Sequence, residues 1–164
     1  MKFATFVSLA AFAATGLGGA AGANAIEVLK TTVVNHPAEK VWALIGEYGH
    51  LDNWHPAVVK LELSGDGGNG VVRKLTLPDG AILTEKLLSY SLNDMSYSYA
   101  ILSGPLPVQN YVSKITVRPG DTPSQSVIEW SSTFEPDNVE AAEAQKIIGG
   151  IYTAGFDGIA DKLK

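Results

Sequence analysis

The chain has 164 residues, a formal net charge of -5 and no cysteine. Without cysteine, disulfides, thiol nucleophiles and zinc–thiolate sites are excluded, so the fold must be held by its hydrophobic core. With 12 Lys and Arg against 17 Asp and Glu, the chain is also a poor partner for nucleic acid or anionic lipid headgroups.

The first residues have the three parts of a secretory signal peptide. Lys2 precedes an apolar run from Phe3 to Ala14, and small residues follow, ending in Ala23-Asn24-Ala25. The apolar run is shorter than the ~20 residues that cross a bilayer. We therefore expect cleavage after Ala25, with residues 1–25 as a signal peptide, residues 26–164 as a single domain, and a periplasmic or secreted location.

Strand patterns dominate the rest of the chain. Residues 26–34 are rich in Val, Ile and Thr and predict a strand. Pro37 then opens a short one-sided helix, and a second short helical turn at residues 51–54 ends before Pro56. Six further strands are predicted at residues 57–63, 70–77, 81–90, 95–101, 107–118 and 126–134. Their short, turn-like connections predict antiparallel neighbours.

The longest helical pattern spans residues 139–163. Its apolar positions recur every three or four residues and form one face: Ile148, Ile151, Tyr152, Gly155, Ile159 and Leu163. Asp137 and Glu140 match a capping box at the start of this helix. The element order is one strand, two short helices, six strands and one long helix, which predicts an α+β domain.

Four glycines lie inside this helix, at positions 149, 150, 155 and 158. Each costs about 1 kcal/mol relative to alanine, so another interaction must compensate. Two explanations are open. Either the helix backbone approaches the sheet closely at these positions, or the missing side chains leave room for a bound molecule.

The hairpin around Pro78-Asp79-Gly80 allows a register to be worked out. Alternation puts Arg73 on the apolar side of the first strand and Glu85 on the apolar side of the second. If Leu75 faces Leu83, then Arg73 stands opposite Glu85, whereas a slip of one residue would put apolar residues opposite the polar face. A charged pair in an apolar wall is costly unless it is well paired or hydrated. The pair is therefore either a self-satisfied bridge or a polar group at a partly hydrated cavity.

Hydroxyl side chains share the inward side of two later strands. Tyr111 and Ser113 alternate in step with Ile115 and Val117, so all four side chains point to the same side of their strand. Tyr99 lies in a row of aromatic residues that could equally form part of the hydrophobic core or line a ligand cavity. The three histidines have no metal-ligand spacing, and no phosphate-binding or dinucleotide-binding glycine motif occurs. We therefore expect neither a metal nor a cofactor.

Four short segments carry a family resemblance: Pro37-Ala38-Glu39-Lys40-Val41-Trp42, Gly70-Val71-Val72-Arg73, Leu83-Thr84-Glu85-Lys86-Leu87 and Asn110-Tyr111-Val112-Ser113. In this order and spacing they resemble the START-like helix-grip superfamily (SRPBCC), in its polyketide cyclase/dehydrase and lipid transport branch. The resemblance spans nearly all of residues 26–164. It implies a seven-stranded antiparallel sheet wrapped around the long C-terminal helix, with two short helices between strands 1 and 2 and an apolar cavity inside.

Plant abscisic acid receptors are distant members with similar motifs. On that resemblance residues 77–81 fall at their gate loop and residues 104–108 at their latch loop, while the lysine that anchors the hormone carboxylate is missing, with Asn53 near its place. Glu85, Tyr99, Tyr111, Ser113 and Glu129 match pocket positions. Glu129 raises a conflict, because alternation would bury its neighbours Ile128 and Trp130 instead, unless a bulge intervenes.

These observations predict a small-molecule site and leave the function open between three classes. The candidate ligand-binding residues are Arg73, Leu75, Leu83, Glu85, Tyr99, Tyr111, Ser113, Glu129, Ile151 and Gly155. The first class is an exported carrier for an apolar or amphipathic molecule. The second is a cyclase or dehydratase with Glu85 as the acid or base. The third, suggested by related periplasmic proteins, is an accessory protein that contacts a dehydrogenase in methanol oxidation.

Overall fold

The computed structural model describes residues 25–164, so residues 1–24 of the expected signal peptide lie outside the described part of the chain. The elements follow the predicted order, and each strand lies within a few residues of its expected bounds. They are β1 (Ile26–Val34), α1 (Ala38–Ile45), the 3₁₀ helix η1 (Tyr48–Asn53), β2 (Lys60–Ser64), β3 (Val72–Thr76), β4 (Ile82–Ser91), β5 (Ser96–Ser103), β6 (Val108–Pro119), β7 (Ser126–Pro136) and α2 (Ala141–Lys162).

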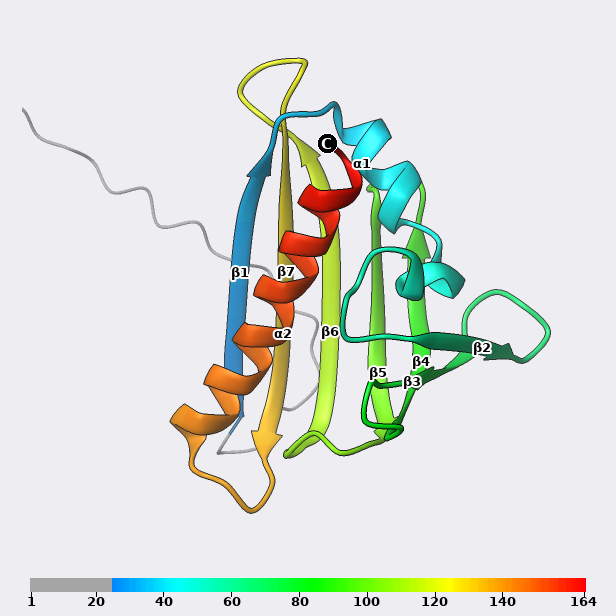
Figure 1. Cartoon of the computed structure of the whole chain (residues 1–164), viewed down its shortest axis with the longest axis vertical. Coiled ribbons are helices and arrows are strands. Elements are labelled where there is room, and N and C mark those ends of the chain that lie inside the picture. The colour runs from blue at the N-terminus through cyan, green and yellow to red at the C-terminus, as the bar shows by residue number, and fades with distance from the viewer. Residues whose placement is uncertain (1–24) are drawn as a thin grey trace, which may run out of the picture.

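The seven strands form one antiparallel sheet in the order β1-β7-β6-β5-β4-β3-β2. Helix α2 lies across β1 and β7, α1 packs against β6 and β7, and η1 packs against β2 (Figure 1). The core lies between this face of the sheet and the three helices. This is the expected α+β helix-grip architecture. Within residues 25–164, neither α-helix is long and apolar enough to cross a membrane.

Helix α2 buries the predicted face but begins differently from the prediction. Ile148, Tyr152 and Ile159 are buried against the sheet. The expected capping box is wrong, because the residue before the first helical turn is Glu140 and no side chain caps it. The carboxylate of Asp137 instead accepts hydrogen bonds from Gln109, at 2.8 Å, and from the neighbouring Asn138 side chain. Asp137 therefore ties the start of β6 to the connection before α2.

Close approach of the backbone explains some of the α2 glycines but not Gly150. A Cβ at Gly155 would meet the ring of Trp130, and a Cβ at Gly158 would meet the backbone oxygen of Trp54, so both are close-approach positions. Gly149 lies beside the Lys30 side chain of β1. At Gly150, by contrast, a Cβ would meet no described atom within 4 Å. Close approach therefore explains the C-terminal half of α2, and only Gly150 borders open space.

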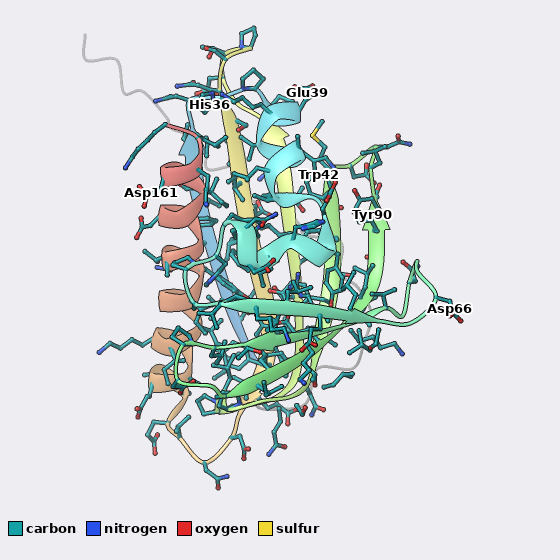
Figure 2. The ribbon with its side chains drawn as sticks, turned by 45° about the vertical axis from the view of Figure 1, so that its right-hand side comes forward. His36, Glu39, Trp42, Asp66, Tyr90 and Asp161 are labelled. Atoms are coloured by element: carbon teal, nitrogen blue, oxygen red, sulfur yellow. The ribbon has the colours of Figure 1, made fainter. Side chains whose placement is uncertain are left out.

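Two contacts hold α1 in place at the end of the core opposite the start of α2. The ring of Trp42 on α1 lies 5.8 Å from that of Tyr90 on β4, at the end of the sheet that α1 covers (Figure 2). His36, just before α1, has its Nε2 at 2.7 Å from the backbone oxygen of Leu163. Lys40 Nζ donates to His36 Nδ1, so the proton of this imidazole lies on Nε2 and is donated to Leu163. The last turn of α2 is thereby attached to the start of α1.

Candidate functional site

The inward charged pair on β3 and β4 has the register expected from the sequence. Arg73 lies opposite Glu85, and Leu75 lies opposite Leu83. Arg73 Nε donates to Glu85 Oε2 at 2.6 Å, and Arg73 Nη1 donates to the backbone oxygen of Tyr48 at 3.0 Å. Only 1% of Arg73 and 4% of Glu85 is exposed. Of the two interpretations of this pair, the geometry supports the self-satisfied bridge.

Tyrosine rings surround the guanidinium of Arg73. Its Cζ lies 4.1 Å from the ring centre of Tyr48, 4.9 Å from that of Tyr99 and 6.0 Å from that of Tyr97. Burial alone would lower the pKa of Arg73, but the carboxylate of Glu85 and the tyrosine oxygens outweigh burial and raise the pKa. The guanidinium therefore stays charged, and Glu85 cancels that charge inside the wall.

A second buried group, which we call the hydroxyl cluster, joins β5, β6 and β7 to α2 and consists of Tyr99, Tyr111, Ser113, Trp130 and Tyr152. Trp130 Nε1 donates to the oxygens of Tyr99 and Ser113, both at 3.1 Å. The Tyr152 hydroxyl bonds to Tyr111 and to Ser113, and its ring stacks on Trp130 with centres 4.4 Å apart. Burial raises the pKa of Tyr99, Tyr111 and Tyr152, so their hydroxyls remain protonated. The cluster is thus a set of neutral hydrogen-bonding groups.

His55 is a buried polar residue whose role the sequence pattern does not indicate. Its Nδ1 accepts from the backbone N–H of Ala57, so its proton lies on Nε2 and is donated to the backbone oxygen of Ile151 on α2, at 3.1 Å. Burial lowers the pKa of His55 to about 4, and the hydrogen bond to Ile151 only partly offsets this. His55 therefore acts as a neutral link between the η1–β2 connection and α2. The only sequence signal for it was its place between Trp54 and Pro56.

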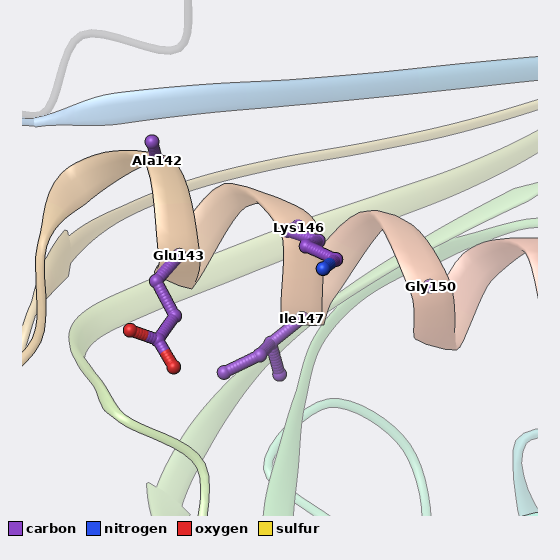
Figure 3. Close-up of a pocket in the computed structure, with 5 residues that line it drawn as sticks. All are labelled: Ala142, Glu143, Lys146, Ile147 and Gly150. Carbon is purple, nitrogen blue, oxygen red and sulfur yellow. The ribbon is translucent and has the colours of Figure 1, made fainter.

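Two hollows lie at the end of the molecule where α2 begins. The first, the α2 hollow, has a volume of about 580 Å³ and is lined by Ala142, Glu143, Lys146, Ile147 and Gly150. Glu143 and Ile147 project from the same side of α2, away from β1 (Figure 3). Because Gly150 has no Cβ, the helix backbone is open to this hollow.

The second, the β5–β6 hollow, has a volume of about 650 Å³ and surrounds the connection between β5 and β6. Its lining includes the residues Ile101, Leu106, Val108 and Tyr111, together with Asp137 from the β7–α2 connection. Tyr111 is the one member of the hydroxyl cluster that lines it. Both hollows are open to solvent rather than enclosed.

Aliphatic side chains around these hollows are only half-buried. Ile101 of β5, Val108 of β6 and Leu106 of the connection between them contact the core. Ile151 of α2, which lines neither hollow, is half-buried as well. Ile147 is also half-buried. Apolar side chains in this state retain accessible area that a second apolar surface can cover, at a gain of roughly 25 cal/mol per Å².

The residues expected at a ligand site occupy several different environments. Tyr111 lines the β5–β6 hollow, and Ile151 lies half-buried on α2. Gly155 packs against Trp130 and His55. The remaining inward residues are buried without lining either hollow, and they are Arg73, Leu75, Leu83, Glu85, Tyr99 and Ser113. Whether any of them binds a ligand stays a prediction.

Glu129 does not lie with these residues, so its assignment to the pocket is corrected. It pairs with Thr31 of β1 and Thr116 of β6 in uninterrupted ladders, while its neighbours Ile128 and Trp130 are buried. Its carboxylate accepts a hydrogen bond from Arg118 on the outer face of the sheet. The bulge that would have turned Glu129 inward is absent at this point of β7, because the register shift between β6 and β7 lies elsewhere, at Gln109 and Val112.

A long C-terminal helix held by a seven-stranded antiparallel sheet, with two short helices after the first strand, defines a helix-grip protein of the START-like class. The chain belongs to the family described as polyketide cyclase / dehydrase and lipid transport, whose model matches residues 25–164.

Three relatives illustrate the similarity. A putative uncharacterized protein from Bacillus thuringiensis is 34% identical with a TM-score of 0.79, over 84% of this chain and 98% of that chain. The protein XoxI from Bacillus cereus is 34% identical with a TM-score of 0.78, over 83% of this chain and 94% of that chain. MLP-like protein 423 from Arabidopsis thaliana is 32% identical over 112 residues, which cover 62% of this chain and 71% of the relative.

These relatives belong to the SRPBCC, or Bet v 1-like, superfamily, as expected from the sequence. Family and fold together indicate a protein that binds a hydrophobic ligand.

Proposed function

We propose that this protein is an exported carrier that holds an apolar or amphipathic molecule where the first turns of α2 meet the β5–β6 connection. The observation that carries the proposal is the set of half-buried aliphatic side chains among the residues that line the two hollows, namely Ile101, Leu106, Val108 and Ile147. Apolar surface of this kind gains free energy when a ligand covers it.

A carrier fits the interior better than a cyclase or dehydratase does. The candidate acid or base, Glu85, accepts a hydrogen bond from a buried guanidinium at 2.6 Å, so its carboxylate is already engaged inside the wall and lines neither hollow. The tyrosine hydroxyls of the hydroxyl cluster have raised pKa values because they are buried, which keeps them from acting as bases near neutral pH. No described residue favours a particular protein partner, and we propose none.

Export is the second part of the proposal. It rests on the pattern of residues 1–25, in which Lys2, an apolar run and Ala23-Asn24-Ala25 follow one another. Expression of the full chain in a bacterial host, followed by cell fractionation and mass measurement, tests it. A mature product beginning at Ile26 outside the cytoplasm supports export, and an intact chain that stays in the cytoplasm contradicts it.

Binding is tested with the purified protein and Nile red, a neutral apolar fluorophore. We expect saturable fluorescence enhancement, and native mass spectrometry of untreated protein should show bound small molecules. The variant Ile147→Lys puts a charge on the apolar rim and should weaken Nile red binding roughly tenfold or more. Leu92→Lys is the matched control, because Leu92 is 66% exposed in the β4–β5 turn. Equal affinity of both variants and the wild type would place the dye elsewhere and contradict the proposed site.

A further inference from the structure

The two edge strands of the sheet differ in their protection against pairing with another chain. At one edge β2 has five residues, and Glu62 on it forms ion pairs with Lys60 and with Lys74 of β3. Short length and charged side chains are common protections of an edge strand. At the other edge β1 has nine residues, no proline and an uninterrupted ladder with β7. Along its free side, β1 therefore offers a long and regular row of backbone N–H and C=O groups (Figure 1).

The outer face of β1 carries exposed apolar side chains. Leu29 and Val33 are 53% and 63% exposed, and Thr31 lies between them on the same face. On β7 their neighbours are Ser131, opposite Leu29, and Val127, opposite Val33. The apolar surface thus continues from β7 to the edge of the sheet and stops there uncovered.

The charged residues of β1 do not protect this part of the outer face. Lys30 points to the inner face, where its side chain lies beside Gly149 of α2. Glu27 points outward near the start of β1, and its backbone oxygen accepts a hydrogen bond from Gln145 of α2. From residue 28 to residue 34 the outer face therefore has no charged side chain.

Two antiparallel copies of β1 have one register that covers the exposed side chains. With Thr31 facing Thr31 of a second copy, Leu29 faces Val33 of that copy and Val33 faces its Leu29, over residues 28–34. A slip of one residue would set outer side chains opposite inner ones. Centring the pair on Lys30 would place two ammonium groups opposite each other, and centring it on Leu29 would leave Val33 without a partner strand.

We propose that the protein forms a symmetric homodimer through β1, in which the two sheets join edge to edge about a two-fold axis at Thr31. On the outer face Val33 then lies between Val127 of its own sheet and Leu29 of the second copy. Because β1 is complementary to itself, a second copy of this chain fits the edge better than a strand of unrelated sequence does.

The dimer does not depend on the carrier function. Glu143 and Ile147 of the α2 hollow project away from β1, and the β5–β6 hollow is separated from β1 by β7 (Figure 3). Both hollows therefore stay accessible when β1 is paired. Nile red binding tests the carrier proposal, whereas the state of association tests the dimer.

The absence of cysteine from the chain allows the register to be tested by a disulfide. Facing residues of an antiparallel pair have Cβ atoms about 4.5–5.5 Å apart, close to the spacing that a disulfide needs. We expect Thr31→Cys to form a covalent dimer under mild oxidation. The matched control is Leu92→Cys, at a 66% exposed position in the β4–β5 turn, which should stay mostly monomeric at the same protein concentration. Equal cross-linking of the two variants would overturn the inference.

A mixture of two variants tests the same register at its flanking positions. Leu29→Cys and Val33→Cys should cross-link with each other in preference to themselves, because Leu29 of one copy faces Val33 of the other. If each variant instead cross-linked mainly with itself, the proposed register would be wrong.

The unmodified protein should associate reversibly, because a contact built on one strand pair is at the small end of protein interfaces. Analytical ultracentrifugation at about 1 µM and about 200 µM should show the monomer replaced by a species of twice its mass. Val33→Lys puts an ammonium group against Leu29 of the second copy at both symmetric positions, so it should weaken the dimer roughly tenfold or more. Leu92→Lys, the control, should leave the dimer unchanged. A monomer at every concentration, or a dimer that Val33→Lys leaves equally stable, would refute the proposal.

Discussion

Replacing Glu85 by Gln removes the negative charge that faces Arg73 and keeps the shape of the side chain. The guanidinium would remain in a site where 1% of Arg73 is exposed, without the carboxylate that accepts from its Nε at 2.6 Å. Breaking a buried ion pair by removing one partner typically costs about 3–5 kcal/mol, because the other charge is left uncompensated. We therefore expect Glu85→Gln to lose about that much stability, a large fraction of the 5–15 kcal/mol typical of a folded domain.

The same substitution at Glu129 provides the control. Glu129 pairs with Arg118, but the side chains are 36% and 56% exposed, so solvent screens the pair and its loss should cost less than about 1 kcal/mol. Urea unfolding followed by tryptophan fluorescence gives both free energies of unfolding, provided that the slope of each transition stays unchanged. Similar costs for the two variants would refute the view that Arg73 is an enclosed charge. Recovery of stability in Arg73→Met/Glu85→Leu, which removes both charges, would support that view.

Three further changes test other parts of the fold by urea unfolding. Gly158→Ala should destabilise by roughly 1–3 kcal/mol, because the added Cβ meets the backbone oxygen of Trp54. Gly150→Ala should stabilise by roughly 0.5–1 kcal/mol, because no described atom lies within 4 Å of that Cβ. If both substitutions stabilised the protein, or both destabilised it, the distinction between a closely packed Gly158 and an open Gly150 would be wrong. Burial lowers the pKa of His55 to about 4 from an ordinary value of 6.5, so its contribution is complete above pH 6.5 and is lost as the pH falls towards 4. The stability advantage of the wild type over His55→Gln should shrink by roughly 3 kcal/mol between pH 7 and pH 4, and a constant difference would show that His55 is not held neutral.

Strand register was predictable where one face is apolar. A slip of one residue reverses every side chain of a strand, so the apolar residues around Arg73 and Glu85 left one arrangement, which the structure contains. The same reasoning on β7 favoured Ile128 and Trp130 as buried, against the family position of Glu129. The structure shows that alternation was the better guide there.

Other features depend on contacts between segments that are distant in sequence. Nothing near Asp137 in the chain indicates that Gln109, from another strand, will bond its carboxylate, and this contact replaces the expected capping box. The link from His55 to Ile151 likewise joins residues 96 positions apart. Glycine spacing alone did not separate Gly155, which packs closely, from Gly150, which borders a hollow, because the distinction depends on which segment covers each position.

The attachments of α2 are unevenly distributed along its length. From Ile151 onwards the helix is tied by His55, by the Tyr152 hydroxyl and, at Leu163, by His36. Before that point, among residues 25–164, a side chain of the helix reaches the sheet by a hydrogen bond only from Gln145 to the backbone oxygen of Glu27 on β1, at 3.5 Å, and the adjacent Gly149 and Gly150 lie where the two halves meet. Paired glycines are points where helices bend. Bending there would change the shape of the α2 hollow while the far half of the helix, with its hydrogen-bonded tyrosine, stayed in place.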